Sequence, residues 1–293
     1  MEQSHLEPLI FSIRHGETIP PAIFSANSLS KALEKSAFLS TGIKYYSQEN
    51  KTKFQSYEQL LSSASEILAG FRELGLEPQA KVILQLSTPD YFLSSLWACF
   101  FGGFVPIPLG VELVSDRSKL AAVCEFDCQL IVTEKSLFKG IHDLVSGKQI
   151  AHPAIATVEN LQDNSPDHNW HESDLDDLAL LLFTSGSTGK PKGVMLSQRN
   201  ILASIYGMAT VNQISDQDIT LNWMPLEHVA SLVMFHLTEV YLGCDQIQVA
   251  SQLILQDPLT WLDLIDRDRV TACLLYTSPS PRDRTRSRMP SSA

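Results

Sequence analysis

One stretch of the chain, residues 178–200, constrains the fold more than any other part of the sequence. It reads LALLLFTSGSTGKPKGVMLSQRN and begins with an unbroken apolar run from Leu178 to Phe183. A short apolar run that leads into a segment of Ser, Thr and Gly is typical of a buried strand followed by a loop. The sequence therefore predicts a sheet that contains this strand, with a loop at the strand's end.

The loop itself, Thr184 to Gly193, combines three glycines, four hydroxyl side chains and two lysines. Glycines permit positive φ angles and let backbone N–H groups approach an anion closely. The hydroxyls add hydrogen-bond donors, and the lysines add positive charge. This combination indicates a loop that binds a polyanion such as a chain of phosphates.

Two common phosphate motifs do not match the loop. A Walker A motif has four residues between its glycines and then Gly-Lys-Ser/Thr, whereas Gly186 and Gly189 are separated by two residues and Pro191 follows Lys190. A dinucleotide G-x-G-x-x-G is absent as well. A flexible Ser/Gly linker is the alternative interpretation. An apolar strand enters the segment and apolar residues 194–196 follow it, which favours a loop fixed at both ends.

The segment FTSGSTGKPKGVMLSQRN resembles the signature loop of the adenylate-forming superfamily, which includes acyl-CoA synthetases, fatty acyl-AMP ligases and nonribosomal peptide synthetase adenylation domains. Every position of the family's phosphate-loop pattern is matched from Leu181 to Lys192. The resemblance implies that a carboxylic acid attacks the α-phosphate of ATP, with Mg²⁺, to give an acyl adenylate and pyrophosphate. The acyl group would then pass to a thiol, either of CoA or of the phosphopantetheine of a carrier protein.

The resemblance also implies roles for individual residues. Lys192 would supply charge to the departing pyrophosphate. The residues that would wrap the β- and γ-phosphates are Thr184, Ser185, Gly186, Ser187, Thr188 and Gly189. The turn Pro-Leu-Glu-His ending at His228 matches a Pro-Leu-x-His turn of the family, in which the histidine lies beside the bound carboxylate and adenylate. His228 is the second expected catalytic residue; the alternative is a histidine that only caps the next helix.

Residues 169–193 and the segment LNWMPLEHVASLVMFH are similar to adenylating units of hybrid polyketide and peptide synthetases. A fragment of a stand-alone fatty acyl-CoA synthetase is an alternative within the same superfamily. A non-catalytic nucleotide-binding remnant is the alternative outside enzymes. The identity of the carboxylic acid is not readable from the residues present.

The composition argues against nucleic acid as a partner, because the chain has 22 Lys and Arg against 33 Asp and Glu, a net charge of −11. Its five cysteines lie within predicted core elements and are expected to be buried thiols, which fits a cytoplasmic protein. His152, His168 and His171 occur near acidic residues at irregular spacing, so they are assigned no metal.

A membrane span is not expected. Tyr91 to Val111 contains no charged residue, but Gly102, Gly103, Pro106 and Pro108 interrupt it. The stretch is therefore predicted to be a buried helix of about ten residues followed by a turn and a strand at the edge of a sheet. The first residues lack the basic start and apolar core of a secretory signal.

The fold class is predicted to be α/β, because helical and strand patterns alternate along the chain with crossover connections. In the first half, a short helix over 28–37 and a hairpin or loop over 45–54 precede this alternation. Helices are predicted over 57–74, 89–101 and 115–125, and strands over 81–86, 105–108 and 129–133. Residues 163–177, which are polar and acidic, are expected to form a surface connection.

In the second half, Ser197 is expected to cap a helix that runs to Asn212 and whose N-terminus points at the phosphate loop. An amphipathic helix is predicted over 229–242, and another follows Asp257 and Pro258. Strands are predicted over 218–224, 246–250 and 270–275.

Three parts of the chain are expected from these patterns. Residues 1–27 form a lead-in that is predicted to be disordered, and residues 28–273 form a truncated AMP-binding (adenylation) domain, the incomplete N-terminal domain of the adenylate-forming fold with layered α/β sheets. Residues 274–293, with four arginines and no apolar period, are predicted to be a disordered or foreign tail. Because the family's adenine-binding segment, ribose-binding aspartate and C-terminal domain with its catalytic lysine are not matched, the chain as given is expected to be inactive or nearly so.

Overall fold

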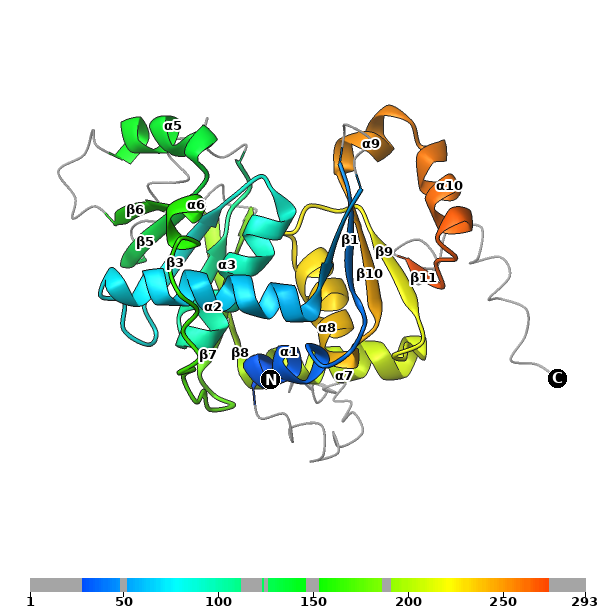
Figure 1. Cartoon of the computed structure of the whole chain (residues 1–293), viewed down its shortest axis with the longest axis horizontal. Helices are drawn as coiled ribbons and strands as arrows, with labels where there is room; N and C mark the ends of the chain where they lie inside the picture. Colours follow the sequence, from blue (N-terminus) through cyan, green and yellow to red (C-terminus); the bar gives the residue numbers. More distant parts are fainter. Residues whose placement is uncertain are drawn as a thin grey trace, which may run out of the picture.

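The computed structural model of the chain describes residues 28–47, 52–111, 123, 126–145, 153–185 and 191–273. Within them it contains a five-stranded sheet, a four-stranded sheet and a two-stranded hairpin, with helices packed between and around them (Figure 1). The predicted α/β class with crossover helices is confirmed. The lead-in, the tail and nearly all of the helix expected over 115–125 lie outside the described residues.

The four-stranded sheet is parallel throughout, in the order β4-β3-β5-β6. Its strands are β3 (Lys81–Gln85), β4 (Val105–Pro108), β5 (Cys128–Thr133) and β6 (Ala154–Thr157). Its helices are α2 (Tyr57–Glu73), α3 (Pro89–Gly102), α5 (Lys135–Val145) and α6 (Val158–Leu161). The Ser56 side chain and the Gln59 side chain form a capping box that starts α2. The uncharged stretch after Tyr91 forms α3 and the edge strand β4, as expected.

The five-stranded sheet has the order β11-β9-β10-β1-β2. Its strands are β1 (Gly42–Tyr46), β2 (Thr52–Ser56), β9 (Ile219–Asn222), β10 (Asp245–Val249) and β11 (Ala272–Cys273). The β1–β2 pair is antiparallel, which confirms the predicted hairpin, and the other pairs are parallel. The helices α9 (Ser251–Gln256) and α10 (Leu259–Arg267) lie beside this sheet in Figure 1, and α9 was not expected from the sequence.

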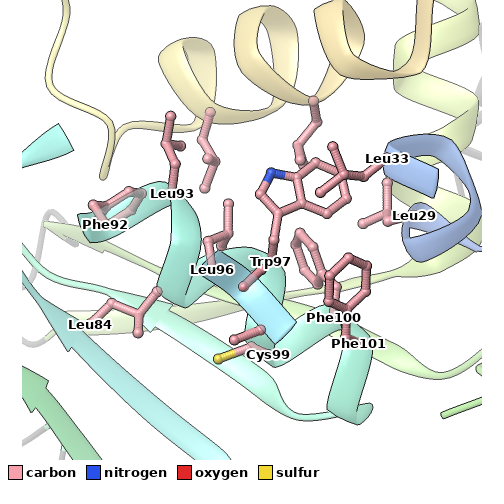
Figure 2. Close-up of a cluster of buried hydrophobic side chains, with 14 of the residues drawn as sticks. Leu29, Leu33, Leu84, Phe92, Leu93, Leu96, Trp97, Cys99, Phe100 and Phe101 are labelled. Atoms are coloured by element: carbon pink, nitrogen blue, oxygen red, sulfur yellow. The ribbon is translucent and has the colours of Figure 1, made fainter. Parts of the chain in front are cut away.

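A core between the two larger sheets is centred on α3, whose residues Phe92 to Gly102 are all buried. Figure 2 shows the Trp97 indole among Phe and Leu side chains of α3, with Leu29 and Leu33 of α1 (Leu29–Ser36) beside it. In β3, Val82 and Leu84 face this core while Ile83 faces a second core on the other side of the sheet. The four-stranded sheet is therefore covered on both faces, as parallel sheets generally are.

The third sheet is a hairpin of β7 (Leu178–Ser185) and β8 (Pro191–Ser197), followed by α7 (Gln198–Asn212). Ser197 and Asn200 form a capping box at the start of α7, so the predicted cap is confirmed. The predicted orientation of α7 is wrong. Ser197 pairs with Leu178, at the opposite end of the hairpin from the loop, and the backbone N–H groups of Gln198 and Arg199 donate to the carbonyls of Asp177 and Leu175. The helix N-terminus is thus bonded to the chain that precedes β7.

The helix predicted over 229–242 as an amphipathic α-helix is instead a π-helix, η3 (Ala230–Leu237), followed by α8 (Thr238–Leu242). It lacks a polar outer face, because its polar side chains Ser231, His236, Thr238 and Glu239 are all buried. The sequence pattern missed this because the burial depends on packing against distant elements; His236, for example, bonds to Trp97 on α3 and to Gln246 on β10.

Candidate active site

The phosphate loop predicted from the sequence lies at the tip of the β7–β8 hairpin. Ser185 pairs with Pro191 and Thr184 with Lys192, so only five residues, 186–190, connect the paired strands. These five lie outside the described residues. Leu180, Leu181 and Leu182 in β7 are buried, which fixes the strand that leads into the loop.

Lys192 is exposed on β8, close to the hairpin tip. Phe183 in β7 packs edge-on against Phe126, with ring centroids 5.0 Å apart. A Cβ on Gly193 would lie 3.1 Å from Leu181 and 3.5 Å from Phe126, so the glycine allows β8 to lie close against these side chains. Packed apolar side chains thus fix the position of the hairpin near its tip, while the Lys192 side chain is exposed and accessible to a ligand.

The carboxyl ends of β3, β4 and β7 lie at the same edge of the fold. The Gln79 side chain donates to the carbonyls of both Gly103, just before β4, and Leu178, at the start of β7. Because β3 and β4 are parallel and in register from Lys81 and Val105, the amino ends of the three strands lie together. Their carboxyl ends, including Ser185, therefore share the opposite edge, which is where open α/β sheets bind ligands.

The Pro-Leu-Glu-His turn comes after β9 and begins η3. The His228 N–H donates to the Pro225 carbonyl at 3.1 Å, and the His228 carbonyl accepts from the Leu232 N–H at 2.9 Å. The imidazole is exposed. Its backbone therefore starts the helix, while its side chain is available to a ligand, and the two interpretations of His228 are compatible.

Glu227 links this turn to the edge that carries the hairpin tip. A Cβ on Gly110, just after β4, would lie 2.7 Å from Oε1 of Glu227, so the carboxylate sits directly over the glycine. The end of β4 and the turn are therefore neighbours. The structure thus brings the hairpin tip and the turn of His228 to one edge, although no hydrogen bond or ion pair joins Lys192 to His228 among the described residues.

A buried polar cluster lies behind the turn, at the carboxyl ends of β9 and β10. The Nδ2 group of Asn222 donates to Ser231 Oγ at 2.5 Å and to Gln248 Oε1 at 2.9 Å. Ser231 Oγ donates in turn to the Met224 carbonyl at 3.1 Å. Gln248 Nε2 is buried and has no hydrogen-bond partner among the described residues. The cluster fixes the backbone between β9 and η3 and hence the position of the turn.

Sequence reasoning identified Lys192 and His228 by motif but missed Glu227, Asn222 and Gln248. Asn222 and Gln248 are separated by 26 positions, and no local pattern connects them. Of the other expected site residues, Thr184 and Ser185 end β7. Gly186, Ser187, Thr188 and Gly189 lie outside the described residues.

Several expected absences concern other kinds of site. Within the described ranges no group of His, Cys, Asp and Glu has the geometry of a metal site. In the same ranges no helix is long and apolar enough to cross a bilayer. Cys99, Cys128, Cys244 and Cys273 are buried, as predicted, and Cys124 lies outside the described part of the chain. His168 is exposed and His171 half-buried.

The chain is similar in sequence to known proteins. The family model described as AMP-binding enzyme matches residues 30–279. Aspulvinone E synthetase melA of Aspergillus terreus is 30% identical over 231 residues, which are 77% of this chain and 25% of that protein. Microperfuranone synthase of Emericella nidulans is 28% identical over 260 residues, 83% of this chain and 27% of that protein. The chain thus spans about a quarter of the length of these curated relatives.

The chain is also similar to solved structures of adenylation domains. The adenylation domain of a keto acid-selecting nonribosomal peptide synthetase module, bound to keto acyl adenylate, superposes with a TM-score of 0.79 at 33% identity, over 85% of this chain and 46% of that one. The McyG adenylation and carrier-protein structure, complexed with phenylalanyl-adenylate, gives a TM-score of 0.80 at 38% identity, over 84% of this chain and 40% of that one. With a family model that covers most of its length, the chain belongs to the AMP-binding enzyme family.

Proposed function

We propose that the protein of which this chain is a part activates a carboxylic acid with ATP, forming an acyl adenylate and pyrophosphate, and passes the acyl group to a thiol. The observation that carries the proposal is the β7–β8 hairpin. Its packed strands present the Ser, Thr, Gly and Lys segment as a five-residue connection at the ligand-binding edge of the fold.

In this proposal the residues of the chain hold charge and position the reacting groups. Lys192 lies beside the β- and γ-phosphates and stabilises the negative charge of the leaving pyrophosphate. Backbone N–H groups and hydroxyls of residues 184–189 donate to the same phosphate oxygens. His228, whose side chain is exposed at the turn, donates a hydrogen bond to the carboxylate or the adenylate and so fixes the line of attack.

The expected site residues suit only the phosphate part of a nucleoside triphosphate. The hydroxyls, glycines and lysines suit the phosphates, and Mg²⁺ would add positive charge between their oxygens. The Glu227 carboxylate lies over Gly110, at the edge beside the turn, and it is assigned no metal-binding role. Groups for adenine and ribose would come from chain beyond residue 273.

The acyl substrate follows from the relatives only as a class. Similar solved domains hold a keto acyl adenylate and a phenylalanyl-adenylate, so we propose an α-keto or α-amino acid rather than a long-chain fatty acid. The acceptor would be a carrier-protein phosphopantetheine thiol, with CoA as the alternative, and the enzyme would work in the cytoplasm.

The test is ATP–pyrophosphate exchange on a complete adenylation domain that contains residues 28–273, with α-keto, α-amino and fatty acids as separate substrates. Exchange with one class is expected. Lys192→Ala should lower kcat/KM by about 100-fold, because charge stabilisation of the departing group is lost. Lys31→Ala, an exposed lysine on α1, is the matched control and should leave exchange unchanged.

Two outcomes would contradict the proposal. The complete domain could fail to exchange with every acid, which would favour a non-catalytic nucleotide-binding protein. Lys192→Ala could turn over at the rate of the parent, which would show that the hairpin takes no part in the reaction. Robust exchange by the 293-residue chain alone would support the function and would contradict only the expectation that this chain is inactive by itself.

A further inference from the structure

A pocket with a volume of about 690 Å³ lies at the amino edge of β3, β4 and β7. Its wall is formed by the end of α2 with the turn that leads to β3, by the end of α3 with the turn that leads to β4, and by residues 167–172, which lead to β7. The candidate active site lies at the carboxyl edge of the same strands. The eight residues of β7 separate the two edges by about 25 Å, at about 3.3 Å per residue.

The wall made by residues 167–172 is firmly attached, although the sequence predicted a simple surface connection. Arg72 forms an ion pair with Asp167 and donates to the Asn169 carbonyl. The His171 N–H donates to the Phe101 carbonyl at 2.7 Å. Trp170 stacks on Phe101, with ring centroids 4.4 Å apart and planes 8° apart. The pocket is therefore preformed and does not depend on a ligand for its shape.

The charge of the pocket is negative. Burial alone would raise the pKa of the Asp167 carboxyl, but the Asn169 N–H and the Arg72 guanidinium outweigh burial and lower that pKa. Arg72 and Asp167 thus neutralise each other. Glu77 and Glu172 are exposed, line the pocket and have no cationic partner in the part of the chain that the structure describes. The lining therefore carries two carboxylates without a cationic partner among the described residues.

Four apolar or aromatic side chains are part of an otherwise polar lining, namely Leu76, Pro78, Phe104 and Trp170. Such a lining suits the alkyl part of a long basic side chain, whose charged end then reaches the carboxylates. An aromatic ring beside a cation adds a further favourable interaction. The surroundings have the same sign, because residues 163–177 contain six acidic residues and no Lys or Arg.

We propose that this pocket is a docking site for a basic segment of a partner protein, which places an arginine or lysine side chain between Glu77 and Glu172. Charge complementarity selects the partner, and the apolar lining holds the stem of the inserted side chain. Docking at the amino edge leaves the opposite edge free, so a partner can be held without blocking the candidate active site.

The experiment measures fluorescence anisotropy of the full chain with a labelled 12-residue peptide in which arginines are spaced by Leu and Ser. The control peptide has citrulline, which is neutral and of the same shape, in place of arginine. Binding of the arginine peptide only is expected. The affinity should fall at least about tenfold in Glu77→Gln/Glu172→Gln and several-fold when NaCl is raised from about 50 to about 300 mM. Glu73→Gln, on the same end of α2 but outside the pocket, is the matched control and should change affinity less than about twofold.

Hydrogen exchange locates the peptide: amides of 72–78 and 167–172 should be protected in its presence. Equal binding of the citrulline peptide, unchanged affinity in the double variant, or no binding would each overturn the proposal. The chain also carries Arg282, Arg284, Arg286 and Arg288. If replacing these four by serine tightens peptide binding, the occupant is the chain's own C-terminal segment, and the proposal of a partner protein is wrong.

Discussion

The indole Nε1–H of Trp97 donates a hydrogen bond of 2.8 Å to Nε2 of His236, and this contact joins α3 to the π-helix η3. The other imidazole nitrogen, Nδ1, lies 2.9 Å from Oε1 of Gln246 on β10. Because Nε2 accepts, Nδ1 carries the proton and donates to Gln246. Gln246 Nε2 then donates to the Tyr57 hydroxyl, which donates to the Cys244 carbonyl. This chain of bonds connects helices of the four-stranded sheet to the five-stranded sheet.

His236→Leu should destabilise the fold by about 2 to 5 kcal/mol, because it leaves the Trp97 N–H and the Gln246 carbonyl buried without partners. Urea unfolding of the chain measures the change. Trp97→Phe should act in the same direction, and the double variant should show a coupling energy of about 0.5 to 3 kcal/mol with His236→Leu. Additive effects would mean that the hydrogen bond contributes nothing to stability.

The same histidine makes stability depend on pH. Burial lowers the pKa of His236 from 6.5 to about 4, against the effect of the Gln246 hydrogen bond. The unfolded chain therefore takes up a proton below about pH 6.5 while the folded chain does not. The stabilisation that comes from keeping His236 neutral in the folded chain is complete above pH 6.5 and is lost as the pH falls toward 4. The penalty of His236→Leu should accordingly be smaller at about pH 5 than at about pH 7.

The features that the sequence predicted are local ones. The predicted cap, Ser197, has its partner Asn200 only three residues away, and the apolar run that became β7 needs no partner to be recognised. Lys192 and His228 could be proposed as site residues because motifs are local as well. The fold class followed from the alternation of these local patterns.

The features that the sequence did not predict depend on contacts between distant residues. The π-helix contains a histidine whose partner on α3 is 139 positions away. The orientation of α7 is set by the pairing of Ser197 with Leu178, since a strand that pairs back along β7 carries the next helix away from the loop. The closeness of Glu227 to Gly110 likewise requires the whole sheet to be formed first. Periodicity within one segment contains none of this information.

Glu134 caps α3 from a neighbouring element, and its removal should destabilise that helix. Oε1 accepts from the backbone N–H groups of Ser87 at 2.5 Å and Thr88 at 2.7 Å, and Oε2 accepts from the Thr88 hydroxyl at 3.0 Å. Thr88, the N-cap residue, makes no side-chain cap of its own. Glu134→Gln removes the charge and one of the two acceptor oxygens, and it should cost about 1.5 to 3 kcal/mol in urea unfolding.

Glu159→Gln is the matched control for Glu134. Among the described residues its half-buried carboxylate accepts from the Lys135 N–H alone, at 3.1 Å. Its replacement should change the unfolding free energy by less than about 0.5 kcal/mol, as surface substitutions usually do. Equal effects of the two variants would contradict a capping role for Glu134.

Two glycines should respond to alanine in opposite directions. A Cβ on Gly102, at the end of α3, would lie 2.1 Å from the buried ring of Phe104, so Gly102→Ala should destabilise by about 1 to 3 kcal/mol. Gly207, inside α7, has nothing within 4 Å of such a Cβ, and Gly207→Ala should stabilise by about 0.5 to 1 kcal/mol. Thermal unfolding followed by circular dichroism separates the two, and a shift of the same sign in both variants would show that these contacts do not decide the outcome.

Replacement of Glu239 on α8 by Gln should make the fold more stable at neutral pH. The residue is 1% exposed, and neither carboxylate oxygen has a hydrogen-bond partner in standard geometry among the described residues. The titratable groups that interact with it are Cys244 and Tyr57, and neither is cationic. Burial raises the pKa of Glu239 from 4.5 to about 8, and the Thr220 hydroxyl offsets only part of that rise.

The sign of the pH dependence follows from this shift. Between pH 4.5 and about 8 the folded chain keeps the Glu239 proton while the unfolded chain loses it. The stabilisation that depends on the protonated carboxyl is therefore complete below pH 4.5 and is lost as the pH rises toward 8. Glu239→Gln keeps the shape without the charge and should gain on the order of 3 kcal/mol at about pH 8 and almost nothing at about pH 4.5. Urea midpoints at those two pH values measure it, with the exposed Glu34→Gln as control. Gln also buries an amide without partners, which costs the same at both pH values, so the ionisation is measured by the difference between them. An equal change in stability at both pH values would mean that ionisation of the carboxyl is not what opposes folding.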